Sequence, residues 1–252
     1  MNTRPRQQTL TLIAIALTFA SGASDVASFT RLGSVFTSVM TGNIVLWGLA
    51  VARGSLSLAS HTAVAVGGYI AGVAVGTWVA HGARGARAAR SDQEGVLPRH
   101  VLWVLLTELT LLAGFAAGWE VSGASPAGWA QFCLLATLAA AMGAQSSAVN
   151  DMGLAQVSTT YLTGTLTGLV SSLVLPGQDT PHGLRRFGVL IGLAAGASLC
   201  GLFVATAADV VPALPLAALV TTLALAAGPG WRRPHLPRRK KALIGTAYLL
   251  AR

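Results

Sequence analysis

The 252-residue sequence is 53% hydrophobic and 10% charged, with 17 lysine and arginine residues against 8 aspartate and glutamate residues. A soluble domain carries about 25% charged residues, so this composition excludes an ordinary water-exposed fold. The excess positive charge is concentrated at 84–99, at Arg185 and Arg186, and at 232–241, each beside an apolar stretch. Basic residues in such places mark the cytoplasmic ends of membrane spans near anionic lipid, so we expect no nucleic-acid partner.

Eight apolar segments follow one another along the chain and predict membrane helices. Each has about 18 residues or more, which is roughly the length that crosses a bilayer as a helix. The sequence shows no strand-like alternation, so we predict an all-α fold, a polytopic transmembrane helical bundle. The segments cover approximately 9–28, 35–52, 60–80, 101–119, 129–149, 157–175, 187–208 and 210–227.

The domain organisation follows from two hydrophilic stretches, 81–100 and 228–241, neither of which resembles a second domain. We predict a single integral membrane domain over 1–227 and a basic cytoplasmic tail over 228–252. The N-terminal stretch has the small residues of a signal-peptide cleavage site after its apolar run. It also belongs to a repeated unit, so we interpret it as a retained helix.

A polar, glycine-containing motif occurs twice in this apolar chain. The first copy, FTSVMTGNIVLWG, covers 36–48 and includes hydroxyl, amide and glycine residues. A weaker copy, LTGT, begins at Leu162, which is 122 residues after the MTGN that begins at Met40. Two copies of one motif predict a duplicated membrane unit, with repeat one at about 9–119 and repeat two at about 129–227.

The segment that follows each motif carries glycines at near-four-residue spacing. Small residues at this spacing allow close helix contact in membranes, so we expect a packing role. The shared pattern also supports the duplication. The glycines are Gly67, Gly68, Gly72 and Gly76 in the first segment, and Gly188, Gly192, Gly196 and Gly201 in the second.

The positions of the basic residues distinguish two counts of membrane crossings. If all eight segments cross completely, at least one basic cluster lies outside, against the positive-inside rule. If 9–28 with 35–52, and 129–149 with 157–175, each make one net crossing, the N-terminus and every basic cluster lie inside. The charges slightly favour this second count, whereas the segment lengths favour eight complete crossings. The number of crossings therefore stays open.

One net crossing for each pair requires broken or re-entrant helices around Ser24–Gly33 and Asn150–Ala155. It leaves Arg53 outside, together with Glu120 and Asp209. The two repeats would then face opposite ways, which is a recurring plan of secondary transporters. Eight complete crossings would instead make the repeats parallel.

Polar residues within the apolar segments are the candidate functional residues, because each is costly in a bilayer. Glu108, in VLWVLLTELTLLAGF, could be a proton or cation relay or could form a structural hydrogen bond. Asp25 could cap a helix start, or line a site with Arg31, and Asn150 and Asp151 occupy the related place in repeat two. The full set of substrate-path candidates is Asp25, Thr41, Gly42, Asn43, Glu108, Gln145, Asn150, Thr163 and Gly164.

Asn43 and Gln145 are the two amides in this set. A buried Asn43 side chain offers two donors and an acceptor to a polar substrate or to exposed backbone. Gln145 lies in an otherwise apolar segment and requires a partner across a helix interface.

The sequence offers no enzymatic or metal-binding pattern. Its five histidines lie at segment ends or in loops without metal-ligand spacing, so we expect them to be solvated. Cys133 and Cys200 lie within apolar runs and are interpreted as small packing residues. No GxSxG, HExxH, P-loop or dinucleotide fingerprint occurs in a suitable context, so we expect no enzyme, cofactor or metal.

Asp25 before a phenylalanine- and glycine-containing turn, followed by MTGN near a helix start, resembles the YoaK-like family of bacterial inner-membrane proteins. The stretches MGAQSSAVNDMG and VSTTYLTGTLTGL resemble the second characteristic region of that family. The resemblance covers roughly 10–225, and the basic tail lies outside it. The family is largely uncharacterised and is taken to contain permeases, so fold and location are implied more than activity. The matching positions of the second region are Gly143, Gln145, Thr160, Thr163 and Gly164.

The sequence therefore predicts a small secondary transporter of the bacterial cytoplasmic membrane with both termini inside, coupled to protons or another cation through Glu108 or Asp25. The expected partners are the lipid bilayer, anionic lipid at the cytoplasmic face and a small polar substrate, and a homo-oligomer is left open. The competing class is a non-transporting scaffold, assembly or lipid-handling protein. Convergence of Asp25, Asn43, Glu108 and Gln145 on one cavity favours transport, whereas separate interhelical bonds favour a scaffold.

Overall fold

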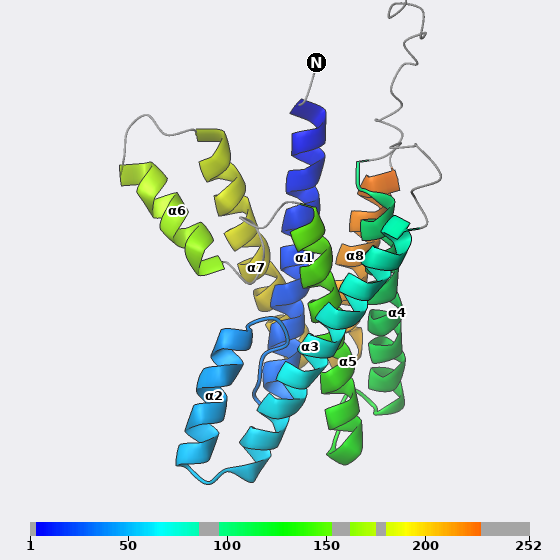
Figure 1. The fold of residues 1–252 in the computed structure, drawn as a ribbon. Helices are drawn as coiled ribbons and strands as arrows, with labels where there is room; N and C mark the ends of the chain where they lie inside the picture. Colours follow the sequence, from blue (N-terminus) through cyan, green and yellow to red (C-terminus); the bar gives the residue numbers. More distant parts are fainter. Residues whose placement is uncertain (1–3, 86–95, 153–161, 175–179, 228–252) are drawn as a thin grey trace, which may run out of the picture.

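The structure is a computed structural model that describes residues 4–85, 96–152, 162–174 and 180–227. All regular secondary structure in these ranges is helical, which confirms the predicted all-α bundle. Figure 1 shows the helices packed as one bundle. They are α1 (Arg4–Arg31), α2 (Met40–Ala52), α3 (Leu56–Gly85), α4 (Arg99–Val121), α5 (Gly128–Asp151), α6 (Leu162–Val174), α7 (Thr180–Thr206), the 3₁₀ turn η3 (Ala208–Val210) and α8 (Ala213–Ala227).

The helices of the described chain fall into two length classes. Six are long and apolar enough to cross a membrane, namely α1, α3, α4, α5, α7 and α8 with η3. The motif helix α2 has only 13 residues, and the described part of α6 also has 13. At 1.5 Å per residue, such a helix spans about 20 Å, which is less than the roughly 30 Å of a hydrocarbon core. By length, α2 crosses only part of a membrane.

The chain path in Figure 1 gives α1 and α2 together one net crossing. α1 runs from the N-terminal end of the bundle to the opposite end. The chain then turns back, and α2 begins part-way along the bundle and runs to that same opposite end. α6 lies in the other half of the bundle and ends near the start of α7. The two short helices therefore run toward opposite ends of the bundle.

The first helix break lies later in the chain than the predicted Ser24–Gly33. α1 is continuous to Arg31, and the irregular segment is 32–39. The hydroxyl groups of Ser21 and Ser28 bond to carbonyl groups of α1 itself, as Ser28 Oγ does to Asp25 O at 3.0 Å, which is compatible with a continuous helix. The helix stops where Gly33 takes a φ of 101° and Ser34 a φ of 58°.

The second predicted break, Asn150–Ala155, is only partly described. α5 continues through Asn150 to Asp151, so the helix is intact at the start of the predicted break. Residues 153–155 lie outside the described residues.

Glycines allow two helix pairs to approach until their backbones touch. A Cβ atom on Gly72 of α3 would overlap the carbonyl oxygen of Ala140, and one on Gly143 of α5 would overlap that of Tyr69. The pair α1–α7 is equivalent, since a Cβ on Gly196 would overlap the carbonyl oxygen of another helix. The predicted packing role is therefore confirmed for most of the predicted glycines, but not for Gly67, where a Cβ would meet no atom within 4 Å, or for Gly201, where the nearest atom would be 3.9 Å away.

The two halves of the chain show matching helices. The described part of α6, Leu162–Val174, lies 122 residues after α2, Met40–Ala52. α1 packs on α7 as α5 packs on α3, and α1 packs on α8 as α5 packs on α4. A duplicated unit predicts these correspondences, and the duplication itself stays an interpretation of the sequence.

Cysteine accessibility tests the path of the chain. In a background with Cys133 and Cys200 replaced by alanine, we expect Gln8→Cys and Ser91→Cys to react with an impermeant maleimide from one side of the membrane. Arg53→Cys should react from the other side, because α1 and α2 together cross once. Eight complete crossings would place Gln8 and Arg53 on the same side of the membrane. Labelling of both positions from one side would therefore contradict the fold.

A second prediction concerns the α3–α5 contact. Gly72→Ala should lower the free energy of unfolding in detergent by about 1–3 kcal/mol, because its methyl group overlaps the Ala140 backbone. Gly67→Ala is the matched control on the same helix, since a Cβ there meets no atom within 4 Å. Equal stability of the two variants in a denaturant titration would contradict this close packing.

Candidate functional site

The Asp25 carboxylate holds the irregular segment that precedes α2. Its Oδ1 accepts hydrogen bonds from the backbone N–H groups of Thr37 and Ser38, both at 2.8 Å. The hydroxyl groups of the same two residues also donate to Asp25, from Ser38 Oγ to Oδ2 at 2.6 Å and from Thr37 Oγ1 to Oδ1 at 3.2 Å. Asp25 is buried, at 7% exposure. It therefore satisfies backbone groups that neither a helix nor water would otherwise satisfy.

Asn43 holds the same segment from the α2 side. Its Oδ1 accepts from Phe36 N at 2.9 Å, and its Nδ2 donates to Phe36 O at 2.6 Å. The side chain thereby pairs with both polar groups of one peptide residue. Asn43 is fully buried, so its predicted interaction with exposed backbone is the one that the structure shows.

The end of α1 is fixed by contacts with three other helices. Arg31 Nη2 donates to Val204 O of α7 at 3.0 Å, and Arg31 O accepts from Gln131 Nε2 of α5 at 3.0 Å. His61 of α3 lies with Nε2 3.1 Å from Gln131 Oε1, and with its ring against Gly33. The expected solvation of the histidines is wrong for His61, because it lies inside this contact and is only 6% exposed.

The predicted site shared by Asp25 and Arg31 is therefore two separate contacts. Asp25 bonds to the segment that follows its own helix, whereas Arg31 bonds to the end of α7. Asp25 does not cap α2 as the sequence suggested, since it binds Thr37 and Ser38, which precede the N-cap residue. The N-cap residue of α2 is Val39, which makes no side-chain cap.

Gln145 joins α5 to α1 at the centre of the bundle. Its Nε2 donates to Leu17 O at 3.1 Å and to Ser21 Oγ at 2.8 Å. This is the partner across an interface that the sequence predicts. Its Oε1 is buried without a hydrogen-bond partner.

Glu108 is the most unusual group in the described structure. Its side chain is fully buried, and neither carboxyl oxygen has a hydrogen-bond partner. It lies on the buried face of α4, between Leu105 and Leu112. The sequence left a relay and a structural hydrogen bond open as its role, and no described residue forms a hydrogen bond with its carboxyl group.

The remaining substrate-path candidates lie at the surface of the chain. Thr41, Asn150, Thr163 and Gly164 are exposed, and Gly42 is half-buried. A Cβ on Gly42 would lie 3.3 Å from the Phe36 ring, so this glycine allows the aromatic side chain to pack on α2. Their predicted role in a substrate path stays a prediction.

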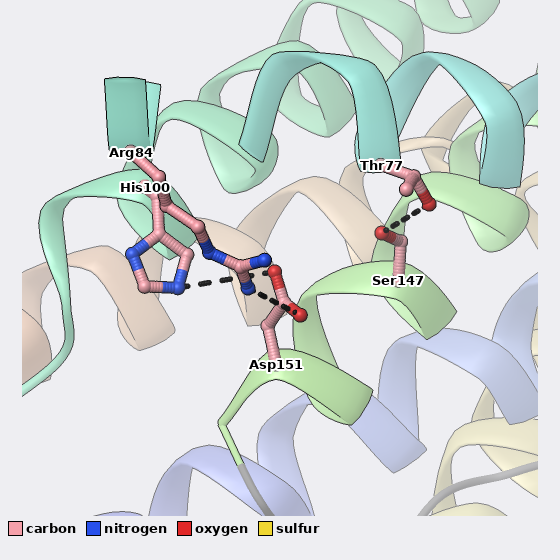
Figure 2. A network of polar contacts seen from close by, with 5 residues as sticks. All are labelled: Thr77, Arg84, His100, Ser147 and Asp151. Carbon is pink, nitrogen blue, oxygen red and sulfur yellow. Dashed lines mark hydrogen bonds and ion pairs between the residues drawn. The ribbon is translucent and has the colours of Figure 1, made fainter. Parts of the chain in front are cut away.

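Figure 2 shows a second polar cluster, at the ends of α3 and α5 and the start of α4. Arg84 Nη2 lies 2.7 Å from Asp151 Oδ1, and His100 Nε2 lies 3.8 Å from Asp151 Oδ2. Thr77 Oγ1 and Ser147 Oγ lie 3.4 Å apart, about two helical turns before Arg84 on α3 and one turn before Asp151 on α5. Because the Arg84 side chain is 48% exposed, this ion pair contributes little stability.

The four buried polar groups do not meet at one place. Asp25 and Asn43 both hold the segment 32–39, Gln145 bonds to α1, and Glu108 faces the core from α4. Among the described residues, no group of three or more histidine, cysteine, aspartate or glutamate side chains could hold a metal ion.

Comparison with known proteins assigns the chain to a protein family. Residues 13–227 match the family described as "Protein of unknown function (DUF1275)". The chain belongs to this family. It is 31% identical over 163 residues to the UPF0700 transmembrane protein YoaK of Bacillus subtilis (strain 168). The matched region covers 65% of this chain and 66% of that relative, just under two thirds of the relative's length. No solved structure matches the chain. The predicted YoaK-like family and the multi-pass membrane location are confirmed.

Sequence reasoning missed three functional contacts in this DUF1275 member. Gln131 and His61 were not selected, although a glutamine within an apolar segment is the same signal that selected Gln145. Ser28 was also missed, and its Oγ donates to Val35 O at 2.8 Å, which satisfies another group of the irregular segment. The ion pair of Arg84 with Asp151 required the tertiary structure, since the two residues are far apart in sequence.

Removal of the Asp25 carboxylate tests its role as the anchor of the segment 32–39. Asp25→Ala should lower the free energy of unfolding by roughly 1.5–3 kcal/mol or more, because it leaves buried N–H groups unpaired. It should also speed amide hydrogen exchange at Thr37 and Ser38. Thr41→Ala, in the same motif but exposed, is the control and should change stability by less than about 0.5 kcal/mol. Unchanged exchange in Asp25→Ala would contradict the anchoring role.

Proposed function

We propose that this DUF1275 member is a small secondary transporter. The observation that carries the proposal is the pair of motif helices. α2 has 13 residues and begins within the bundle, and the described part of α6 also has 13 residues and runs toward the opposite end. Discontinuous helices in an inverted arrangement recur in secondary transporters, and their inner ends form the substrate site. The irregular segment 32–39 fits this plan, since non-helical backbone at membrane depth occurs where protein or a wet cavity surrounds it.

We propose the bacterial cytoplasmic membrane as the location, with both termini on the cytoplasmic side. In Figure 1 the start of α1, the end of α3 and the starts of α4 and α7 lie at the same end of the bundle. Arg84, Arg99, Arg185 and Arg186 belong to these helix ends. The positive-inside rule assigns that end to the cytoplasm, where these side chains would also attract anionic lipid.

The substrate that this arrangement suits is small and polar. The inner ends of α2 and α6 carry the exposed hydroxyl groups of Thr41 and Thr163, and backbone N–H groups at helix starts favour electron-rich groups. At α2, the carboxylate of Asp25 binds the N–H groups of Thr37 and Ser38, which lie just before the helix. A solute that carries hydroxyl or carbonyl groups could therefore bind between the two helix starts.

A non-transporting scaffold is the second candidate, and one observation favours it. Asp25, Asn43 and Gln145 make separate structural hydrogen bonds instead of lining one cavity. In a scaffold, α2 and α6 would face lipid along their whole exposed length. The two candidates therefore differ in whether water reaches the inner ends of these helices.

Thiol reactivity in liposomes tests this difference. In the background without native cysteines, Thr41→Cys and Thr163→Cys should react with a charged methanethiosulfonate reagent, because the thiolate forms only in water. Ile70→Cys and Ile191→Cys are the controls, since both side chains are apolar, exposed and in the middle of long helices. A transporter predicts many-fold faster reaction at both threonine positions than at the controls. Equally slow reaction at all four positions would overturn the proposal and leave the scaffold.

A further inference from the structure

The two carboxyl groups that lie within the long apolar helices have opposite environments. Asp25 accepts four hydrogen bonds from Thr37 and Ser38, two of them from backbone N–H groups. Glu108 has none within the described chain, although its side chain is fully buried. An ionised carboxylate is stabilised by several donors, whereas one without donors in a low-dielectric interior is very costly. The surroundings of Asp25 suit a carboxylate, and those of Glu108 suit a neutral acid.

Contacts between α4 and α5 locate Glu108 along the bundle. A Cβ on Gly118 of α4 would lie 2.7 Å from Leu134 Cδ2 of α5, so these two positions are level with each other. The helices are antiparallel, as Figure 1 shows. Ten residues before Gly118 is Glu108, and ten residues after Leu134 is Ala144. Glu108 is therefore level with Ala144. The next residue along α5 is Gln145, which donates hydrogen bonds to α1.

Other buried oxygen atoms without partners lie near this level. Gln145 Oε1 is one, and the Gln145 side chain is 1% exposed. Ser24 Oγ of α1 is another, about one helical turn from Ser21, to which Gln145 donates. α1, α4, α5 and α8 pack as a closed set, because α4 and α1 each contact both α5 and α8. The centre of this set contains polar atoms whose hydrogen-bonding capacity is unused.

Two ionisable residues on the helices that pack around Glu108 lie near its level. Asp25 of α1 is one, four residues after Ser21, to which Gln145 donates. Tyr69 of α3 is the other, since a Cβ on Gly143 would overlap Tyr69 O. The other ionisable residues are at least seven residues away along their helices, which is about 10 Å or more. They are Arg4, Arg6 and Arg31 on α1, His61, His81 and Arg84 on α3, Arg99, His100 and Glu120 on α4, and Cys133 and Asp151 on α5, whereas the described part of α8 (213–227) contains none.

We propose that Glu108 is the proton-binding residue of this protein, neutral in the conformation described here and ionised when water reaches it. Its O–H bond then breaks, and water takes the proton. A metal cation would require about six oxygen ligands in place, whereas a proton requires one carboxyl group. The role of Glu108 in coupling rests on the proposed transport function. Between the candidates, the inference selects Glu108 over Asp25 and a proton over other cations.

Infrared spectroscopy of the protein in liposomes tests the proposal directly. At pH 7, we expect the C=O stretching band of a protonated carboxylic acid, whereas an exposed glutamate with a pKa of about 4.3 is ionised. Glu108→Gln should remove this band, and Asp25→Asn should retain it. Raising the pH should convert it into carboxylate bands. Absence of a protonated acid at pH 7 in the unmodified protein would overturn the proposal.

Chemical labelling identifies the residue and the ion without relying on the stability of a variant. Dicyclohexylcarbodiimide adds to protonated, buried carboxyl groups, and peptide mass analysis of the unmodified protein should place the adduct on Glu108. Labelling should fall as pH rises and should not change with sodium concentration at constant pH. An adduct on Asp25, or protection of Glu108 by sodium, would overturn the choice of residue or of ion.

These results are separable from the test of transport. The infrared band and the adduct need no transported solute, and the thiol reactivity of positions 41 and 163 does not involve Glu108. If both threonine positions are inaccessible while the band titrates, proton binding stands and transport fails. If they react but no protonated acid is present, transport stands and coupling through Glu108 is excluded.

Discussion

The constraint on which this fold depends is that backbone polar groups within a membrane must be paired inside the protein. The segment 32–39 is not helical, so its peptide groups cannot pair with one another as those of a helix do. Asp25 and Asn43 supply the missing donors and acceptors from two adjoining helices. Ser28 supplies one more, to Val35 O. This pairing makes a short helix, α2, compatible with the interior of a membrane protein.

The close helix contacts provide the rigid frame that holds this segment. Without a hydrophobic driving force between helices in lipid, association depends on backbone approach and dispersion contacts. Gly72 and Gly143 permit that approach between α3 and α5, and Gly22 and Gly196 permit it between α1 and α7. α2 packs mainly on α3, and α6 packs mainly on α7. Each short helix is therefore attached to one member of a glycine-mediated pair.

The interior is polar in two different ways. Around Asp25 nearly every hydrogen-bonding group has a partner, which is the arrangement of a structural element. Around Glu108 the carboxyl oxygens have none, which natural proteins accept mainly where the group has a functional task. The contrast separates the residues that hold the segment 32–39 from the residue that could exchange a proton.

The sequence by itself determined the membrane-spanning helical class, the basic helix ends and the two motifs at which full-length helices are interrupted, because apolar length, charge and glycine are local signals. It also selected the buried residues Asp25, Asn43, Glu108 and Gln145. Only the tertiary structure decided that the break follows Arg31 and which of these groups have partners. Lipid and core are both apolar, so hydrophobic periodicity does not fix how a membrane helix is rotated, and rotation decides which side chains meet.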